Sequence, residues 1–154
     1  MSERTRAEGP QSALALLTSL GGAVVPGPRT LDWFPLVGAA IGAAVGGVWW
    51  AAANFWLAPI AAALTLAADA ILTGGLHYDG LADTADGLLP PLSRERRLEV
   101  MRDPRSGAFA LLTLSIIVAL RITAFASTPP SWVSVAAIWC ASRTAMALGA
   151  RLLP

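Results

Sequence analysis

A stretch of 23 consecutive residues without a charged side chain, 34–56, restricts the folds open to this chain more than any other feature. Crossing the hydrocarbon core of a bilayer takes about 20 apolar residues of helix. In lipid the backbone must satisfy its own hydrogen bonds, and a helix does so within one segment. Of all residues, 55% are hydrophobic and only 14% are charged. The sequence therefore predicts an all-α, polytopic membrane protein.

Four segments are apolar enough to cross a bilayer as helices. They are residues 34–56, 57–76, 106–127 and 132–148. The apolar run within residues 1–33 has about fifteen residues, which is short for a span and predicts an interfacial or re-entrant helix. Residues 77–105 carry many of the charges and are expected to form a helical loop outside the membrane. The chain is thus predicted to be one membrane domain over 1–154, a bundle of about four transmembrane helices.

Glycines recur every four residues in the first predicted span, at Gly38, Gly42 and Gly46. This spacing leaves one face of a helix without side chains, so that another helix backbone can approach closely. We expect the face to pack against a neighbouring helix. The same face suggests a homo-oligomer formed through the helix at 34–56.

The arginines indicate the orientation of the spans. The 11 basic residues are all arginines, and nine of them lie before the first span, between the second and third, or after the fourth. These are Arg4, Arg6, Arg29, Arg94, Arg96, Arg97, Arg102, Arg105 and Arg151. With four crossings, the segments before the first span, between the second and third, and after the fourth all lie on one side of the membrane. The positive-inside rule predicts that this side is the cytoplasm. The net charge of +1 gives no sign of a nucleic-acid partner, which would require clustered excess positive charge.

Three charged residues remain inside the predicted spans, namely Asp69, Arg121 and Arg143. A charge in the middle of a membrane costs at least about 2.5 kcal/mol, so each needs a partner or a water-filled cavity. Arg121 is near the outer end of its span, from which its side chain can extend outward. Asp69 lies deeper, and Arg143 is one candidate partner for it.

An acidic motif follows the second span directly. Asp79, Asp83 and Asp86 are spaced i, i+4 and i+7, which places them on one face of a helix. Three like charges on one face repel each other unless a cation lies among them, and Mg²⁺ prefers oxygen ligands and substrate phosphates. The alternative is that the aspartates cap and charge the first turn of a helix. We expect a metal site.

Two glycines and a histidine accompany the aspartates. Gly75 and Gly80 lack side chains, so a phosphate or another backbone can come close to them. His77 is a lone histidine at the predicted membrane surface. It is expected either to act in catalysis or to hydrogen-bond to backbone.

A second charged block precedes the third span. Arg102, Asp103 and Arg105 follow a short amphipathic segment that is expected to lie on the membrane surface. Arginine side chains suit phosphate recognition, and an aspartate between them can supply a further metal ligand or a base. Juxtamembrane arginines also fix topology, which is the alternative reading.

Residues 75–87 (GLHYDGLADTADG) and 99–107 (EVMRDPRSG) together resemble the cobalamin synthase family, the adenosylcobinamide-GDP ribazoletransferases. The pair Ser142-Arg143 resembles a third family feature. The resemblance implies a Mg²⁺-dependent transfer in the inner membrane, late in cobalamin (vitamin B12) biosynthesis. α-Ribazole, or its 5′-phosphate, would be joined to adenosylcobinamide-GDP with release of GMP.

On this resemblance and the physical arguments above, the expected site has three parts. The expected metal ligands are Asp79, Asp83 and Asp86. The expected catalytic residues are Asp83, Asp103 and His77. The expected substrate-binding residues are Arg102, Arg105, Gly75 and Gly80.

The chain departs from the family pattern in two places. Ser19 stands where members often have an arginine, and members usually continue through further spans where this chain reaches Pro154. The chain is therefore expected to correspond to about the first two thirds of a usual member and to lack the C-terminal part.

Two other functions remain open. One is a CDP-alcohol phosphatidyltransferase-like membrane enzyme, although its signature needs an arginine soon after Asp79-Gly80, and none is present. The other is a small transporter or ion-coupled subunit that uses Asp69 and Arg143 within the bilayer.

Overall fold

The computed structural model describes residues 8–22 and 25–152. In this part the chain forms α-helices and one 3₁₀ helix, without a β-strand, which confirms the predicted all-α class. In chain order the elements are α1 (Pro10–Leu17), η1 (Pro28–Trp33), α2 (Phe34–Ala52), α3 (Ala58–Thr73), α4 (Leu76–Leu88), α5 (Arg94–Val100), α6 (Ala108–Ala126) and α7 (Trp132–Leu152).

Three helices of the described part are long and apolar enough to cross a membrane. They are η1 with α2 (Pro28–Ala52), α6 and α7. The predicted span at 57–76 is different, because α3 has 16 residues and reaches the required length only together with α4, from which it is bent by 91°. The prediction of about four spans holds if this bent pair counts as one. The acidic motif therefore lies on a helix that turns away from α3.

The bend has a local cause at two glycines. Gly74 and Gly75 have φ angles of +63° and +70°, a left-handed conformation that other residues rarely adopt. Gly75 donates its N–H to the Ala70 carbonyl at 2.8 Å, which ends α3. Ser19, just after α1, donates its N–H to the Leu72 carbonyl at 2.9 Å and thus satisfies another free carbonyl of that end. The predicted N-terminal helix is present as the eight-residue α1, which packs against η1 and α2.

The glycine stripe packs α2 against α7. A Cβ atom on Gly42 would lie 2.7 Å from Cβ of Trp139 and 2.8 Å from Cα of Ala136, and Gly38 and Gly46 are equally close to α7. The expected close approach of a neighbouring helix is confirmed. α7 of the same chain covers this face, so the glycine stripe is already occupied, and the suggested homo-oligomer stays a prediction.

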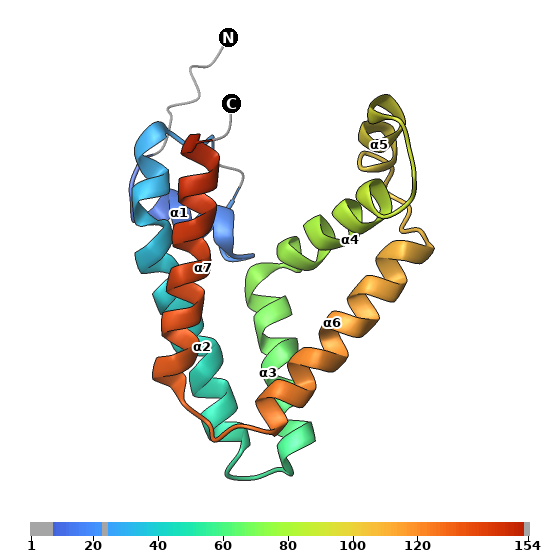
Figure 1. Ribbon diagram of the computed structural model, residues 1–154. Coiled ribbons are helices and arrows are strands. Elements are labelled where there is room, and N and C mark those ends of the chain that lie inside the picture. Colours follow the sequence, from blue (N-terminus) through green and yellow to red (C-terminus); the bar gives the residue numbers. More distant parts are fainter. Residues whose placement is uncertain (1–7, 23–24, 153–154) are drawn as a thin grey trace.

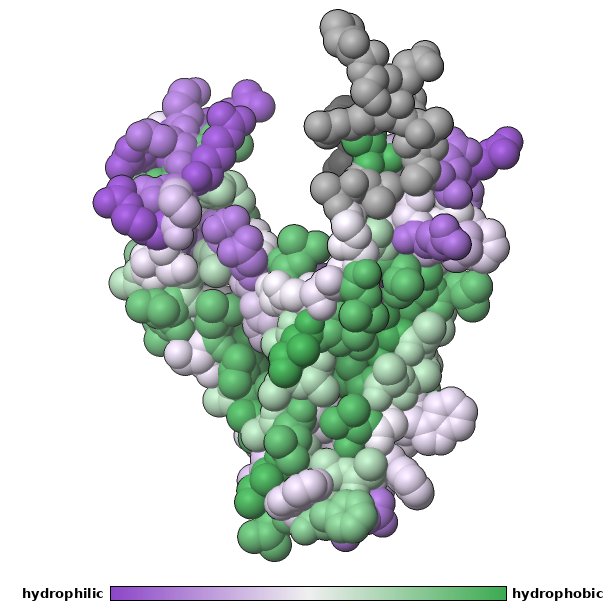
Figure 2. Space-filling model, turned by 180° about the vertical axis from the view of Figure 1, so that it is seen from behind, coloured by the Kyte–Doolittle hydropathy of each residue, from purple (hydrophilic) through white to green (hydrophobic). Residues whose placement is uncertain are grey.

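The helices form two arms, one made of α2 and α7 and the other of α3, α4 and α6 (Figure 1). The loops from α2 to α3 and from α6 to α7 lie at one end, whereas α5 and the C-terminal end of α7 lie at the other. This agrees with the prediction that the loop containing α5 and the C-terminal end of α7, which both carry arginines, lie on the same side of the membrane. Arg4 and Arg6 lie outside the described residues. Figure 2 shows hydrophobic side chains over the middle of the molecule and hydrophilic ones gathered at the end that carries α5.

Candidate active site

A cleft of about 220 Å³ lies between α4 and the segment that joins α5 to α6. We call it the α4 cleft. Its lining residues are Asp79, Asp83, Met101, Arg102, Asp103, Pro104, Arg105 and Ser106. Five residues predicted for the site, two from the acidic motif and three from the second charged block, are thus brought together. The i, i+4 spacing on α4 turns the two aspartates of the motif toward the same loop.

Asp86, the third aspartate of the motif, has another partner. Its Oδ2 atom accepts the Gly107 N–H at 2.6 Å and its Oδ1 atom accepts the Ala110 N–H at 2.9 Å. These are free donors at the first turn of α6, where a negative charge is also favoured by the helix dipole. Asp86 is 9% exposed and does not line the α4 cleft. Both carboxylate oxygens of Asp86 thus hold the first turn of α6 against α4, whereas the expected role of Asp86 as a metal ligand stays a prediction.

Asp103 and Arg105 form a two-point ion pair at the rim of the cleft. The Arg105 Nε atom donates to Oδ1 of Asp103 at 3.0 Å, and Nη2 donates to Oδ2 at 2.7 Å. These hydrogen bonds lower the pKa of Asp103 to about 2. A carboxylate with so low a pKa accepts a proton poorly, so the pairing favours a role for Asp103 in charge balance over the expected role as base.

The three other predicted site residues lie outside the cleft. Gly75 forms the bend between α3 and α4, and its φ of +70° is the reason for a glycine there. Gly80 is on α4 with open space beside it. His77 lines a different cavity, of about 340 Å³. We call this second space the intramembrane cavity.

With this geometry in place, the family model of cobalamin-5-phosphate synthase matches residues 11–154 of the chain. The chain belongs to the cobalamin-5-phosphate synthase family. The resemblance seen in the two motifs is thereby confirmed.

Several curated relatives of this family are similar to the chain, and each is called adenosylcobinamide-GDP ribazoletransferase. That of Bradyrhizobium diazoefficiens is 40% identical over 124 residues, covering 78% of this chain and 48% of that protein. That of Escherichia coli is 40% identical over 124 residues, covering 78% and 50%. That of Roseiflexus sp. is 36% identical over 107 residues, covering 70% and 40%.

The chain spans about half the length of these relatives or less, in place of the expected two thirds. No solved structure matches it.

The intramembrane cavity of this family member lies between α3, α4, α6 and α7. Its lining residues are Asp69, His77, Arg121, Ile138, Trp139, Ser142 and Arg143. The Asp69 carboxylate pairs with Arg121 at 2.9 Å and accepts the Trp139 indole N–H at 3.3 Å. The suggested pair of Asp69 with Arg143 is not a direct ion pair in the structure, because Arg143 bonds to the hydroxyl of Ser142 at 3.2 Å and the charge of Asp69 acts on it only at longer range.

Arg121 also differs from expectation, because its side chain turns into the protein and does not extend outward. It donates to the hydroxyl oxygen of Tyr78 as well as to Asp69. Its guanidinium lies 5.4 Å from the ring centroid of Trp139. Tyr78 and Trp139 were missed at the sequence level, where the one available signal was their position beside the two motifs, residues 75–87 and Ser142-Arg143.

Proposed function

We propose that the α4 cleft joins adenosylcobinamide-GDP to α-ribazole or its 5′-phosphate, giving adenosylcobalamin or its 5′-phosphate and GMP. The observation that carries this proposal is the meeting of Asp79 and Asp83 with Arg102 and Arg105 in one cleft. The names of the relatives supply the substrates and favour this transferase over the CDP-alcohol enzyme and the transporter.

We propose Mg²⁺ as the cofactor, on the chemistry of the donor set. No cluster of three or more His, Cys, Asp or Glu suited to a metal is found among the described residues. Magnesium is commonly held by one or two carboxylates together with substrate phosphate oxygens, so Asp79 and Asp83 fit such a site. When bound, the ion would neutralise charge on the diphosphate. Asp86 is not needed for it.

The residues of the cleft have separable tasks in this proposal. Arg102 and Arg105 bind diphosphate oxygens, because guanidinium groups pair with phosphate through two parallel hydrogen bonds. A ribose hydroxyl oxygen forms a bond to the phosphorus linked to cobinamide, and the bond from that phosphorus to the departing GMP oxygen breaks. The hydroxyl proton passes to the carboxylate of Asp83. His77 lies outside the cleft and has no part in this transfer.

We propose further that the cleft opens to the cytoplasm from the inner membrane. The support is the distribution of arginines, since the loop with α5 and the end of α7 lie at one end of the molecule (Figure 1). Both substrates would then reach the cleft from the aqueous side.

The experiment compares metal binding and product formation in the full chain, reconstituted in vesicles. Mn²⁺, used as a spectroscopic probe for Mg²⁺, is titrated by electron paramagnetic resonance, and GMP release is followed with adenosylcobinamide-GDP and α-ribazole. Asp83→Asn should weaken Mn²⁺ binding at least about 10-fold and lower GMP release at least about 100-fold.

The matched control is Glu95→Gln, which removes an exposed carboxylate of α5 that does not line the cleft. It should leave both readouts unchanged. Equal Mn²⁺ binding by wild type and Asp83→Asn would overturn the metal site. Mn²⁺ binding by wild type without GMP release would overturn the transfer by this chain alone.

A further inference from the structure

The intramembrane cavity contains a buried arginine, Arg143, that forms no ion pair among the described residues, although the charge of Asp69 acts on it at longer range. Arg143 is 6% exposed, its Nε atom has no hydrogen-bond partner, and no ion pair joins it to any carboxylate of residues 8–22 and 25–152. Its side chain contacts the hydroxyl of Ser142, which carries no charge. An unpaired charge among membrane helices is costly, so such a group is usually matched by a counter-charge.

A second unpaired group lines the same cavity. Both ring nitrogens of His77 are buried and have no hydrogen-bond partner. Buried polar atoms are nearly always hydrogen-bonded, and those that are not call for an explanation. An acceptor placed in the cavity would take a hydrogen bond from the imidazole N–H as well as from Nε of Arg143.

The charges of the cavity select the kind of acceptor. Asp69 is its one carboxylate among the lining residues, and Arg121 already pairs with it at 2.9 Å. Arg143 therefore leaves an excess of positive charge in the cavity. We propose that the intramembrane cavity binds the phosphoryl oxyanion of an amphiphilic molecule, held by Arg143 and His77.

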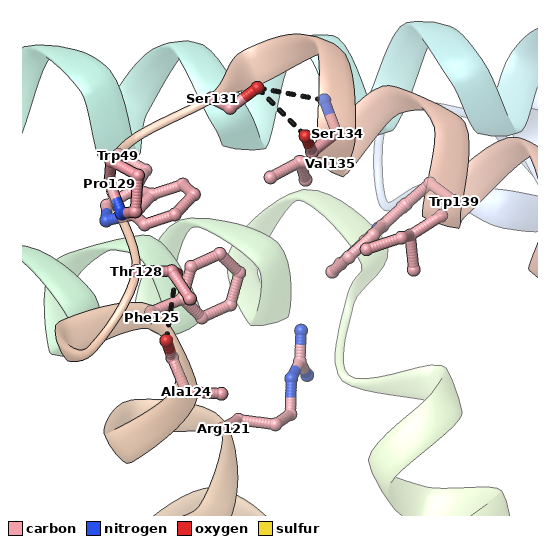
Figure 3. A pocket seen from close by; sticks show the side chains of 11 residues that line it. Trp49, Arg121, Ala124, Phe125, Thr128, Pro129, Ser131, Ser134, Val135 and Trp139 are labelled. Carbon is pink, nitrogen blue, oxygen red and sulfur yellow. Dashed lines mark hydrogen bonds between the residues drawn. The ribbon is translucent and has the colours of Figure 1, made fainter.

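The adjoining space fits the apolar part of such a molecule. An apolar pocket of about 480 Å³ shares Arg121, Ile138 and Trp139 with the cavity. Figure 3 shows Arg121 directed into this pocket, with the aromatic rings of Trp49 and Phe125 on another side. A charged head and an apolar body can thus lie in two adjoining spaces. A phospholipid and a phosphorylated aromatic substrate such as α-ribazole 5′-phosphate share this chemistry.

The experiment measures binding of dodecyl phosphate to the full chain in dodecyl maltoside micelles by calorimetry. Arg143→Gln should weaken binding at least about 10-fold, because it removes the charged hydrogen bond to the oxyanion. Arg29→Gln, which changes an exposed arginine of η1, is the matched control and should bind like wild type. Equal affinities of wild type and Arg143→Gln would overturn the proposal.

A second variant separates loss of binding from loss of folding. Asp69→Asn keeps one acceptor oxygen in place of the two that take hydrogen bonds from Arg121 and Trp139, and it removes the negative charge from the cavity. It should bind dodecyl phosphate about 3-fold more tightly or better, since the net positive charge of the cavity rises. Circular dichroism of this variant in the same micelles checks that it is folded, and weaker binding by the folded variant would contradict an anion site.

Competition then identifies the source of the phosphoryl group. Displacement of dodecyl phosphate by phosphatidylglycerol assigns the cavity to a lipid, and displacement by α-ribazole 5′-phosphate assigns it to a substrate. Equal displacement by dodecyltrimethylammonium would show that charge plays no role and would overturn the proposal. The test reads binding in the absence of divalent metal, so it is independent of the transfer proposed for the α4 cleft.

Discussion

The α4 cleft and the intramembrane cavity are both built on α4, yet they hold their charges in different ways. In the cleft, Asp103 pairs with an Arg105 side chain that is 87% exposed, and water surrounds much of the site. In the cavity, the side chain of Asp69 is only 8% exposed and is bonded to both Arg121 and Trp139. Water lets charged groups gather without fixed partners, whereas the membrane interior requires a partner for each.

This difference separates two reasons for keeping a charged residue. Removing a carboxylate from the cleft should change binding and chemistry and leave the fold intact. Removing one from the cavity should damage the fold first, because it strands a buried partner.

The strongest test compares Asp69→Ala with Asp83→Ala. Asp69→Ala leaves Arg121 without its carboxylate and should lower the free energy of unfolding by about 3–5 kcal/mol. Asp83→Ala removes a half-buried carboxylate with no hydrogen bond to a neighbour among the described residues. The free energy of unfolding of this variant should stay within about 0.5 kcal/mol of the wild-type value. Unfolding in detergent micelles, followed by circular dichroism, measures both. Equal losses would show that the two regions hold charge in the same way.

Packing of α7 provides the next test, since α7 carries Trp139 and Arg143 into the cavity but not into the cleft. A larger side chain at Gly42 would meet Trp139 and Ala136, so Gly42→Leu should cost about 1–3 kcal/mol and disturb the cavity. Gly47→Leu is the control, because a Cβ there meets nothing within 4 Å. Mn²⁺ binding at the cleft should survive in both variants. Its loss in Gly42→Leu alone would show that the two regions are coupled.

A substitution of Asp86 tests whether this aspartate stabilises the fold while Asp79 and Asp83 bind the metal. Asp86→Ala removes the acceptor for the Gly107 and Ala110 N–H groups and should destabilise the protein by about 1–2 kcal/mol. Its Mn²⁺ affinity should remain close to that of wild type, in contrast to Asp83→Asn. Thermal unfolding measures the stability of the variant, and a Mn²⁺ titration on the same samples measures its Mn²⁺ affinity. A stable variant that no longer binds Mn²⁺ would restore Asp86 as a metal ligand.

Much of the fold could be predicted because it depends on local pattern. Apolar length predicted the positions of α2, α6 and α7, and the four-residue glycine spacing predicted the close approach at Gly42. The motif spacing also indicated correctly that Asp79 and Asp83 share one helix face. These features need only the helical period and the thickness of a bilayer.

The rest depends on contacts between distant segments. Spacing places Asp86 on the same face as Asp83, but only the position of α6 shows that Asp86 meets the first turn of that helix. Likewise, the choice of Arg121 as direct partner of Asp69 follows from the packing of α6 against α3. The bend at Gly74 and Gly75, which turns α4 away from α3, is a further case. The tandem glycines were visible in the sequence, but their φ angles were not.

The smallest expected effect concerns the exposed ion pair of the cleft. Arg105→Gln removes the two hydrogen bonds that lower the pKa of Asp103, so this pKa should rise from about 2 toward its ordinary value of 3.8. Since the folded-state pKa is the lowered one, the pair stabilises the protein above the ordinary pKa, and this contribution disappears as the pH falls through about 2.

Carboxyl ¹³C chemical shifts of labelled aspartate, titrated with acid in micelles, measure the change in the pKa of Asp103. Arg94→Gln is the control, because Arg94 is not among the groups that shift Asp103. An unchanged pKa in Arg105→Gln would mean that water competes fully with this pair, and the contrast with the buried partners of Asp69 would then be sharper still.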